Sequence, residues 1–397
     1  MRNYRAHCSY FYLGIILAGW FCASPLLAQE EVGNRSVGQT DVLTESEWED
    51  VNDSVDRALN WLASRQQRNG SFPTSRHGQP GVTSLCTLAF LAQGHLPNEG
   101  KYGQTLAKSL DFIAACQRRN GLLASTGPNE LMINRNVGPD VGVAASYNHA
   151  LAGIALCESY GISGPETSEK LQPVIEKALL ASFQMNDWRK ERAMDAGGWR
   201  YLHKKDQMDS DLSVTGWQLM FLRSAKNAGF DVAKNRIQKA VGYIRRSFEK
   251  ERGSFIYKLK DPYGNRTSRG MAGAGILALA HSGLHQSDEA QRAGEWVLKS
   301  GFRDYNAQGR IKTRGRNEDR YFYGLLTCGP AMYQLGGRHW REFFPPTAAV
   351  LMKNQNEDGS WDPENHRTDS KWGNEYTTAV GVLVLSAANE LLPIYQR

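Results

Sequence analysis

The stretch Gln355-Asn356-Glu357-Asp358-Gly359-Ser360-Trp361, which a polar segment separates from an apolar run at residues 376–385, decides the fold of this chain. The same order of features occurs near its start, where Gln66 and the Asn-Gly-Ser-Phe sequence at residues 69–72 precede an apolar run at residues 83–91. A recurring unit of this kind is typical of repeat architectures, in which each unit buries its apolar face only against its neighbours. We therefore expect a series of packed helix pairs.

Four further units align between these two, at intervals of about 50 to 65 residues, longer than the helical repeats of short fixed period. Their first helices are expected to end near residues 112–121, 180–199, 243–255 and 296–309. Their second helices are expected at residues 147–160, 213–229, 271–283 and 321–336. The sequence thus predicts an all-α domain of six helix pairs, with insertions in the connections.

The two helices of each unit differ in composition. The first is amphipathic, as Leu59 and Leu62 with Arg57 and Arg65 illustrate, whereas the second consists almost wholly of apolar and small residues. A helix that is apolar on all sides is buried, and small residues such as those at positions 273–275 let helices approach closely. This difference predicts an inner ring of helices enclosed by an outer ring.

The Gln-x-x-x-Gly-x-Trp or Phe element resembles the repeats of the squalene cyclase and protein prenyltransferase superfamily over roughly residues 50–392. The resemblance is strongest at residues 355–361 and weakest in the fifth unit, where Gly301 and Gly309 replace a clean Gly-x-Trp. It implies an α/α toroid in which the glutamine and the tryptophan tie neighbouring helices together. A shared repeat indicates a fold and not a chemistry.

The N-terminus has the pattern of an export signal. Arg2 and Arg5 precede an apolar run at residues 10–27, and Leu26-Leu27-Ala28, which ends in a small residue, gives a plausible signal-peptidase site. We expect a signal peptide at residues 1–28, a flexible polar lead-in at 29–49 and one toroid domain at 50–397. The protein would then be periplasmic or secreted, or membrane-anchored if the signal is not cleaved.

Charge and cysteine usage restrict the function further. The formal net charge of +6 falls to +4 when Arg2 and Arg5 leave with the signal peptide, and no basic run is dense enough to predict nucleic-acid binding. The mature chain keeps four cysteines, at positions 86, 116, 157 and 328, all within apolar segments. Their spacing favours buried thiols, with one disulfide as the alternative, and it predicts no metal site.

The best candidate for catalysis is Asp209-Ser210-Asp211 at the start of the third inner helix. It resembles the Asp-x-Asp-Asp motif of triterpene cyclases, which implies that Asp211 is a general acid that protonates an alkene or epoxide, with Asp209 tuning its pKa. Leu212 replaces the last Asp of that motif. The alternative is that Asp211 caps the helix by accepting backbone N–H groups.

Aromatic residues gather near the expected mouth of the toroid, where they predict either a ligand pocket or a packed aromatic core. The pocket candidates are Tyr147, Trp199, Tyr201, Trp217, Tyr321, Tyr323 and Tyr376. Such a wall suits a hydrophobic ligand, or a glycan that stacks on aromatic rings.

Three classes of function follow. The favoured one is a binding toroid that takes a ligand or partner, with a protein or a membrane closing its mouth. The first alternative is a terpenoid cyclase, although cyclases of the resembled family form their cavity between two such domains. The second is a polysaccharide hydrolase or lyase that uses two acids among Asp195, Asp209, Asp211 and Asp319. Prenyl transfer would need a zinc site of Asp, Cys and His, which the inner-helix starts lack, so no cofactor is expected.

Overall fold

The computed structural model describes residues 41–396 except 205, 263, 265, 308–311, 314–315 and 318. The predicted signal peptide and most of the predicted lead-in lie outside the described residues. The first described helix begins at Glu45, within the segment predicted as a lead-in. No helix in the described part of the chain combines the length and apolarity needed to cross a bilayer.

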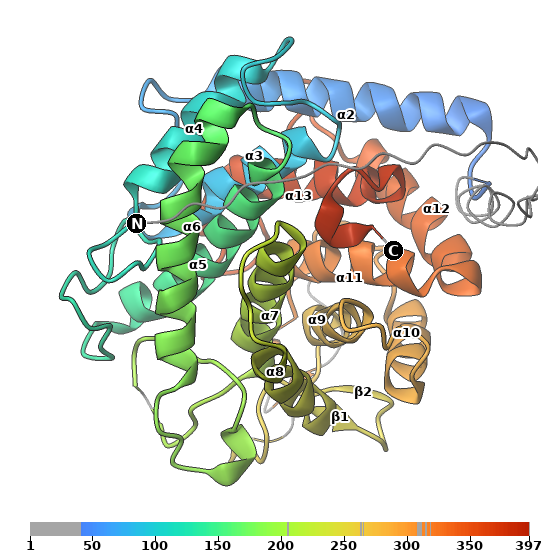
Figure 1. Cartoon of the computed structure of the whole chain (residues 1–397). Coiled ribbons are helices and arrows are strands. Elements are labelled where there is room, and N and C mark those ends of the chain that lie inside the picture. Colours follow the sequence, from blue (N-terminus) through green and yellow to red (C-terminus); the bar gives the residue numbers. More distant parts are fainter. Residues whose placement is uncertain are drawn as a thin grey trace, which may run out of the picture. The chain divides into compact units, whose positions relative to one another are not determined.

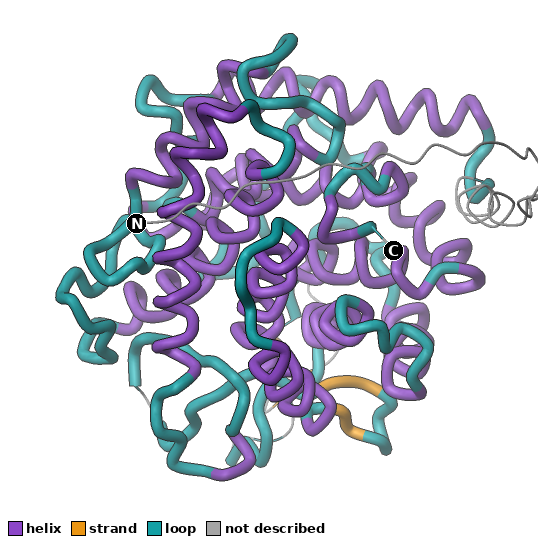
Figure 2. The backbone as a smooth tube through the Cα atoms, viewed as in Figure 1, coloured by secondary structure: helices purple, strands orange, loops and turns teal. Residues whose placement is uncertain are grey.

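The described chain is mostly helical, and its helices fall into two sets that alternate along the sequence (Figures 1 and 2). One set is α2 (Glu45–Arg65), α4 (Gly103–Ala115), α6 (Pro165–Asn186), α8 (Lys234–Arg246), α10 (Asp288–Ser300) and α12 (Gly337–Lys353). The other is α3 (Gly81–Leu91), α5 (Pro139–Tyr160), α7 (Leu212–Asn227), α9 (Arg269–Ala280), α11 (Tyr321–Leu335) and α13 (Gly373–Leu385). Two short antiparallel pairs join helices, β1 (Phe248–Glu249) with β2 (Ser254–Phe255) and β3 (Lys312–Thr313) with β4 (Arg316–Asn317).

The second set, which we call the inner helices, packs in a closed cycle. Each contacts the next in the order α3, α5, α7, α9, α11, α13, and α13 contacts α3 again. Every residue of α3 is buried, as expected for a helix that is apolar on all sides, whereas α2 buries only one stripe. The first set, which we call the outer helices, is therefore exposed on one face and packed on the other.

The glutamines of the repeat join consecutive outer helices. After α2, the Gln66 side chain donates to the Thr105 carbonyl of α4 at 2.8 Å, and after α4, Gln117 donates to Val174 of α6 at 2.7 Å. After α12, Gln355 donates to the Ser54 carbonyl of α2 at 2.8 Å. The last repeat thus binds the first outer helix, which links the two ends of the folded domain.

The repeat glycines make the same connection through close backbone approach. Gly70, Gly121, Gly197 and Gly359 all have φ between +87° and +92°. A Cβ added at any of them would lie 2.1–2.5 Å from a backbone carbonyl oxygen of an outer helix, which for Gly359 is that of Arg57 in α2. Only glycine fits both the positive φ and the contact.

We expect Gly359→Ala to lower the free energy of unfolding by more than the roughly 1–3 kcal/mol that positive φ alone costs. Gly229→Ala is the control, because Gly229 has φ of +91° but no atom within 4 Å of its Cβ position. Urea unfolding of both variants measures the difference. Equal losses would mean that the contact between Gly359 and α2 contributes nothing.

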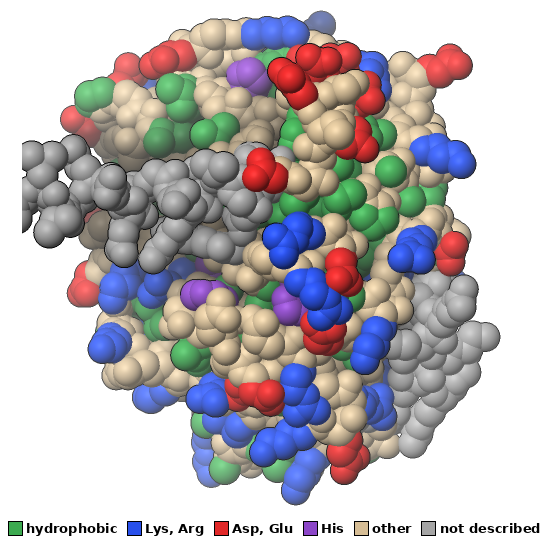
Figure 3. Space-filling model, turned by 90° about the vertical axis from the view of Figure 1, so that its right-hand side faces the viewer, with side chains coloured by type: hydrophobic (Ala, Val, Ile, Leu, Met, Phe, Trp, Pro, Cys, Tyr) green, Lys and Arg blue, Asp and Glu red, His purple; other side chains and the backbone are tan. Residues whose placement is uncertain are grey.

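The surface of the described chain is mixed in charge. On the face shown in Figure 3, basic and acidic side chains are interspersed. Arg245 pairs with Glu289 at 2.7 Å, and Arg338 pairs with Glu295 at 2.8 Å. The four described cysteines are all free thiols, and three of them are buried.

Candidate functional site: a cavity among the inner helices

A cavity of about 430 Å³ lies where the inner helices begin. Residues in or just before the first turns of all six line it, from Gly81 of α3 to Tyr376 of α13. All six inner helices therefore run in the same sense, away from the mouth of the cavity. The volume lies within the range of roughly 300–1,000 Å³ that small-molecule sites occupy.

Aromatic side chains form much of the cavity wall: Tyr147, Tyr201, Trp217, Tyr257, Tyr323, Trp372 and Tyr376. The Tyr147 hydroxyl donates to Ser213 Oγ at 2.8 Å, Ser213 Oγ also hydrogen bonds the Tyr323 hydroxyl, and Trp217 Nε1 donates to Tyr323 at 3.3 Å. Tyr201 and Tyr257 hydrogen bond each other.

These phenols stay neutral at physiological pH. Burial raises the pKa of Tyr323 to about 12 and raises the pKa of Tyr147 well above its ordinary value. Because the hydroxyls of Tyr147, Tyr201, Tyr257 and Tyr323 bond to one another or to Ser213, the wall presents mainly ring surfaces to the cavity.

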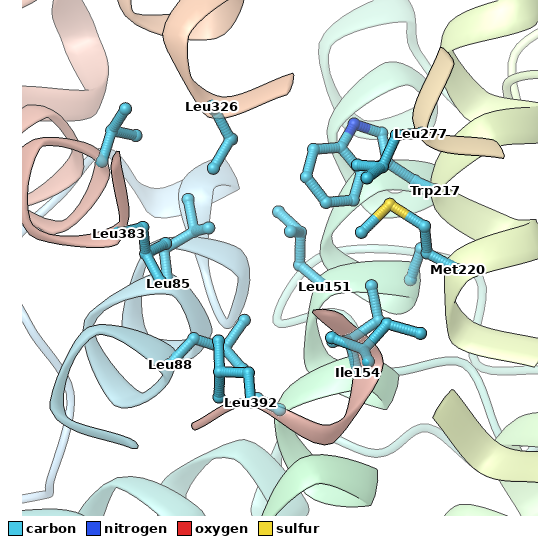
Figure 4. Packing of buried hydrophobic residues seen from close by; sticks show 14 of the residues in the cluster. Leu85, Leu88, Leu151, Ile154, Trp217, Met220, Leu277, Leu326, Leu383 and Leu392 are labelled. Carbon is cyan, nitrogen blue, oxygen red and sulfur yellow. The ribbon is translucent and has the colours of Figure 1, made fainter. Parts of the chain in front are cut away.

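The floor of the cavity is apolar. Val82, Leu85, Leu151, Met271 and Leu326 line it, and Figure 4 shows Leu326 with Trp217 at one end of a larger apolar cluster and Leu85 and Leu151 in its middle. The deeper part of this cluster contains leucine and isoleucine side chains from further along the same helices. An apolar group that reaches this floor would bury part of its surface away from water.

The mouth carries the cavity's charges, and most are paired. Arg320 forms an ion pair with Asp369, and Arg266 is paired with Asp261 at 2.9 Å. Lys371 approaches Asp140 at 3.9 Å, with 40% of its side chain exposed. The lining therefore combines an apolar floor, an aromatic wall and a polar entrance.

Asp211 is fully buried at the N-cap of α7 and is not part of the cavity lining. Its Oδ1 accepts the Val214 N–H at 2.9 Å, and its Oδ2 accepts from the Arg200 guanidinium at 3.1 Å. Burial raises the pKa of Asp211, while Arg200 and the Val214 N–H act in the opposite direction. Both oxygens are thus engaged within the protein.

Asp209 also lies outside the cavity lining. It accepts from Arg135 at 2.5 Å and from the Glu191 N–H at 2.8 Å. Burial acts to raise the pKa of Asp209, but these two hydrogen bonds outweigh it and hold the pKa below its ordinary value. Asp209 and Asp211 bind different arginines, so neither is placed to tune the other directly.

Carboxylates occupy the same position at two other inner helices. Glu364 accepts the Tyr321, Phe322 and Tyr323 N–H groups at the start of α11, at 2.8–3.1 Å. Asp319 accepts the first N–H of α9 at 2.8 Å and pairs with the Arg269 guanidinium at 2.7 Å. Asp211 belongs to this set of carboxylates that complete the inner helix starts.

The structure places five of the seven predicted pocket aromatics in the cavity wall: Tyr147, Tyr201, Trp217, Tyr323 and Tyr376. Trp199 and Tyr321 lie in the core instead. Trp199 Nε1 donates to the Ser182 carbonyl at 2.9 Å, and the Tyr321 hydroxyl donates to Phe302 at 3.2 Å.

The other predicted acids do not line the cavity either. Asp195 is fully buried and pairs with Arg192 at 2.8 Å, just as Asp319 pairs with Arg269. Among the described residues, the carboxylates of the lining are Asp140 and Asp369. Sequence reasoning missed Tyr257, which reaches the cavity from the loop after β2, because that loop lies outside the repeat pattern.

Comparisons with known proteins show a similarity in fold alone. No model of a protein family matches the sequence, and no curated protein is significantly similar to it. Among solved structures, the type II terpene cyclase MstE from Scytonema, bound to its product merosterolic acid A, is 14% identical with a TM-score of 0.53. A glycosidase in complex with glucose is 13% identical with a TM-score of 0.57. Each match covers 88% of this chain and 100% of the other. The chain thus has a helical fold similar to that of a terpene cyclase and a glycosidase.

Proposed function

We propose that this chain is an α/α toroid of six helix pairs that binds a small, mainly apolar ligand in its central cavity. The observation that carries the proposal is the cavity itself, with its floor of Leu85, Leu151, Met271 and Leu326 and its wall of aromatic rings. Burial of apolar surface supplies most of the binding free energy in such a site, and the few polar groups at the mouth orient the ligand.

The two enzymatic alternatives have less support. Terpenoid cyclisation by Asp211 would need that carboxyl to reach the ligand, yet Arg200 and Val214 occupy its oxygens outside the cavity lining. Glycoside hydrolysis would need two acids aimed at one bond, and of the lining acids Asp369 is paired with Arg320. A binding function requires neither.

Export is a further part of the proposal. The basic start, the apolar run at residues 10–27 and the small residues before position 29 favour a cleaved leader. The ligand would then be one that is met in the periplasm or outside the cell. Detection of mature protein in the periplasmic fraction, with Gln29 as its first residue, is the expected outcome.

Filling the floor tests the binding proposal. We expect Leu151→Trp to weaken binding of an apolar fluorescent dye by about tenfold or more, because the indole would occupy the apolar end of the cavity. Leu131→Trp is the matched control, since Leu131 lies in a loop with 81% of its surface exposed. Dye titration with a parallel circular dichroism melt separates lost binding from lost folding. Equal dye affinity in both variants would contradict the proposal.

A further inference from the structure

The residues that follow α13 lie at the end of the inner helices opposite the mouth of the cavity. This C-terminal segment, residues 386–396, contains the short 3-10 helices η4 (Ala387–Asn389) and η5 (Pro393–Tyr395). Its polar contacts come from side chains at or just beyond helix C-termini: Gln93 after α3, Glu158 in α5, and Tyr333 and Gln334 in α11.

These contacts are short and specific. Glu158 accepts the Ile394 N–H at 2.9 Å, Gln334 donates to the Tyr395 carbonyl at 2.5 Å, and Tyr333 donates to Glu390 at 2.6 Å. The Tyr395 ring stacks on His281, the C-cap of α9, with centroids 6.0 Å apart. In addition, η5 packs on α7, and η4 continues directly from α13.

The segment therefore contacts all six inner helices, and its side-chain partners lie at their C-terminal ends. Because the inner helices form a closed cycle, a short segment that reaches every member has to lie across the axis of that cycle. It covers the C-terminal ends of the inner helices.

Three side chains of this segment join the apolar cluster of the core, those of Ala387, Leu392 and Ile394. Leu392 is 4% exposed and joins the apolar cluster, whereas its neighbour Leu391 is 47% exposed. Figure 4 shows Leu392 beside Leu88 and Ile154, at the opposite end of the cluster from Leu326 and Trp217.

The distance from this side chain to the cavity floor is small. Leu88 follows the floor residue Leu85 by three positions, and Ile154 follows the floor residue Leu151 by three. Three residues of α-helix rise about 5 Å, so the floor lies about one helical turn from the layer that Leu392 completes. A change in volume at Leu392 is thus transmitted to the floor through a single layer of packed side chains.

We propose that the C-terminal segment sets the depth of the cavity, with Leu392 as the residue that determines the longest apolar chain that fits. The inference rests on the proposed ligand binding and adds its specificity: the ligand carries a linear or narrow apolar chain that enters with its tail toward Leu392.

The test is a series of straight-chain primary alcohols of increasing length, each titrated against an apolar dye bound to the mature protein. Within the cavity each added methylene is expected to raise the affinity about fourfold, and the gain should stop at the length that reaches the floor. Leu392→Ala should move this limit to longer alcohols by about two carbons, because it removes three carbon atoms below the floor. Leu392→Phe should move it to shorter ones, and this second variant keeps the test valid if the first folds poorly.

Leu391→Ala is the matched control, and the alcohol length at which its affinity stops rising should equal that of the wild type. An unchanged limit in both Leu392 variants, with normal binding by the wild type, would overturn the role of Leu392 and leave the binding proposal intact. A shift in Leu391→Ala equal to that in Leu392→Ala would also overturn it. Failure of the wild type to bind any alcohol would overturn both proposals.

Discussion

Substitution of Asp211 by alanine is expected to lower the free energy of unfolding by about 3–5 kcal/mol, the usual cost of breaking a buried ion pair on one side. Arg200, which is 6% exposed, would lose its Asp211 partner at 3.1 Å and keep the longer ion pair with Asp206 at 3.3 Å. The start of α7 would also lose its cap, which contributes about 1 kcal/mol. Urea unfolding at neutral pH measures the sum.

Asp211→Asn separates the two contributions. The amide oxygen of Asn still accepts the Val214 N–H, so this variant should keep the cap and lose only the charge. Asp187→Ala is the control, because Asp187 pairs with Arg236 at the surface with 61% of its side chain exposed, and such pairs contribute about 0–1 kcal/mol. Wild-type stability in Asp211→Ala would refute the structural role and reopen catalysis by this residue.

The second large effect is a change in pH dependence. Burial raises the pKa of Glu158 to about 7, above its ordinary value of 4.5, despite hydrogen bonds from Ser224 and Ile394. A carboxyl with a raised pKa in the folded state holds its proton more tightly there than in the unfolded chain. Its contribution to stability is therefore full below about pH 4.5 and is lost as the pH rises toward and past 7.

Glu158→Gln removes this titration. Relative to the wild type, the variant should gain on the order of 3 kcal/mol of stability between pH 5 and pH 8. The comparison has to be made with the wild type at each pH, because burial also lowers the pKa of His149 and His281 to about 3, which stabilises the fold as pH rises up to about 6.5.

The same substitution at Glu169, an exposed residue of α6, is the control and should leave the pH profile unchanged. Chemical unfolding at a series of pH values gives both profiles. Parallel curves for the wild type and Glu158→Gln would show that Glu158 does not titrate between pH 5 and pH 8.

The helix pairs could be predicted from the sequence because their signals are local. Residues equivalent to Gln355, Gly359 and Trp361 occur in several units. Each of them makes contacts that are set by its position in the unit. The alternation of amphipathic and fully apolar helices likewise follows from composition, and the structure shows the fully apolar set buried and in mutual contact. The helix that begins at Glu45 lies partly within the predicted lead-in, because its polar first turn resembles a linker in sequence.

The candidate site could be predicted only in part, because a helix start tells which residues are near the cavity and not which way they face. Tyr321 and Tyr323 are two residues apart, so their side chains point roughly 200° apart around α11. Tyr323 faces the cavity, and Tyr321 faces Phe302 in the core. Trp199, in turn, occupies the structural tryptophan position of its unit.

Asp211 illustrates a different limit. The sequence around it fits both a helix cap and a general acid, since both place an aspartate before the first turn of a helix. The distinction comes from Arg200 and from the absence of Asp211 from the cavity lining, which depend on tertiary packing. The C-terminal segment lacks any periodicity, so its place across the inner helices could not be inferred from residues 386–396 alone.

The most direct test of ligand binding in the cavity is a crystal structure of the mature protein saturated with the tightest-binding alcohol of the series. Our account predicts electron density for one alkyl chain between Leu151, Trp217 and Tyr323, with its tail toward Leu85 and its hydroxyl toward the mouth. An empty cavity at saturating alcohol, or density only on the outer surface, would contradict it.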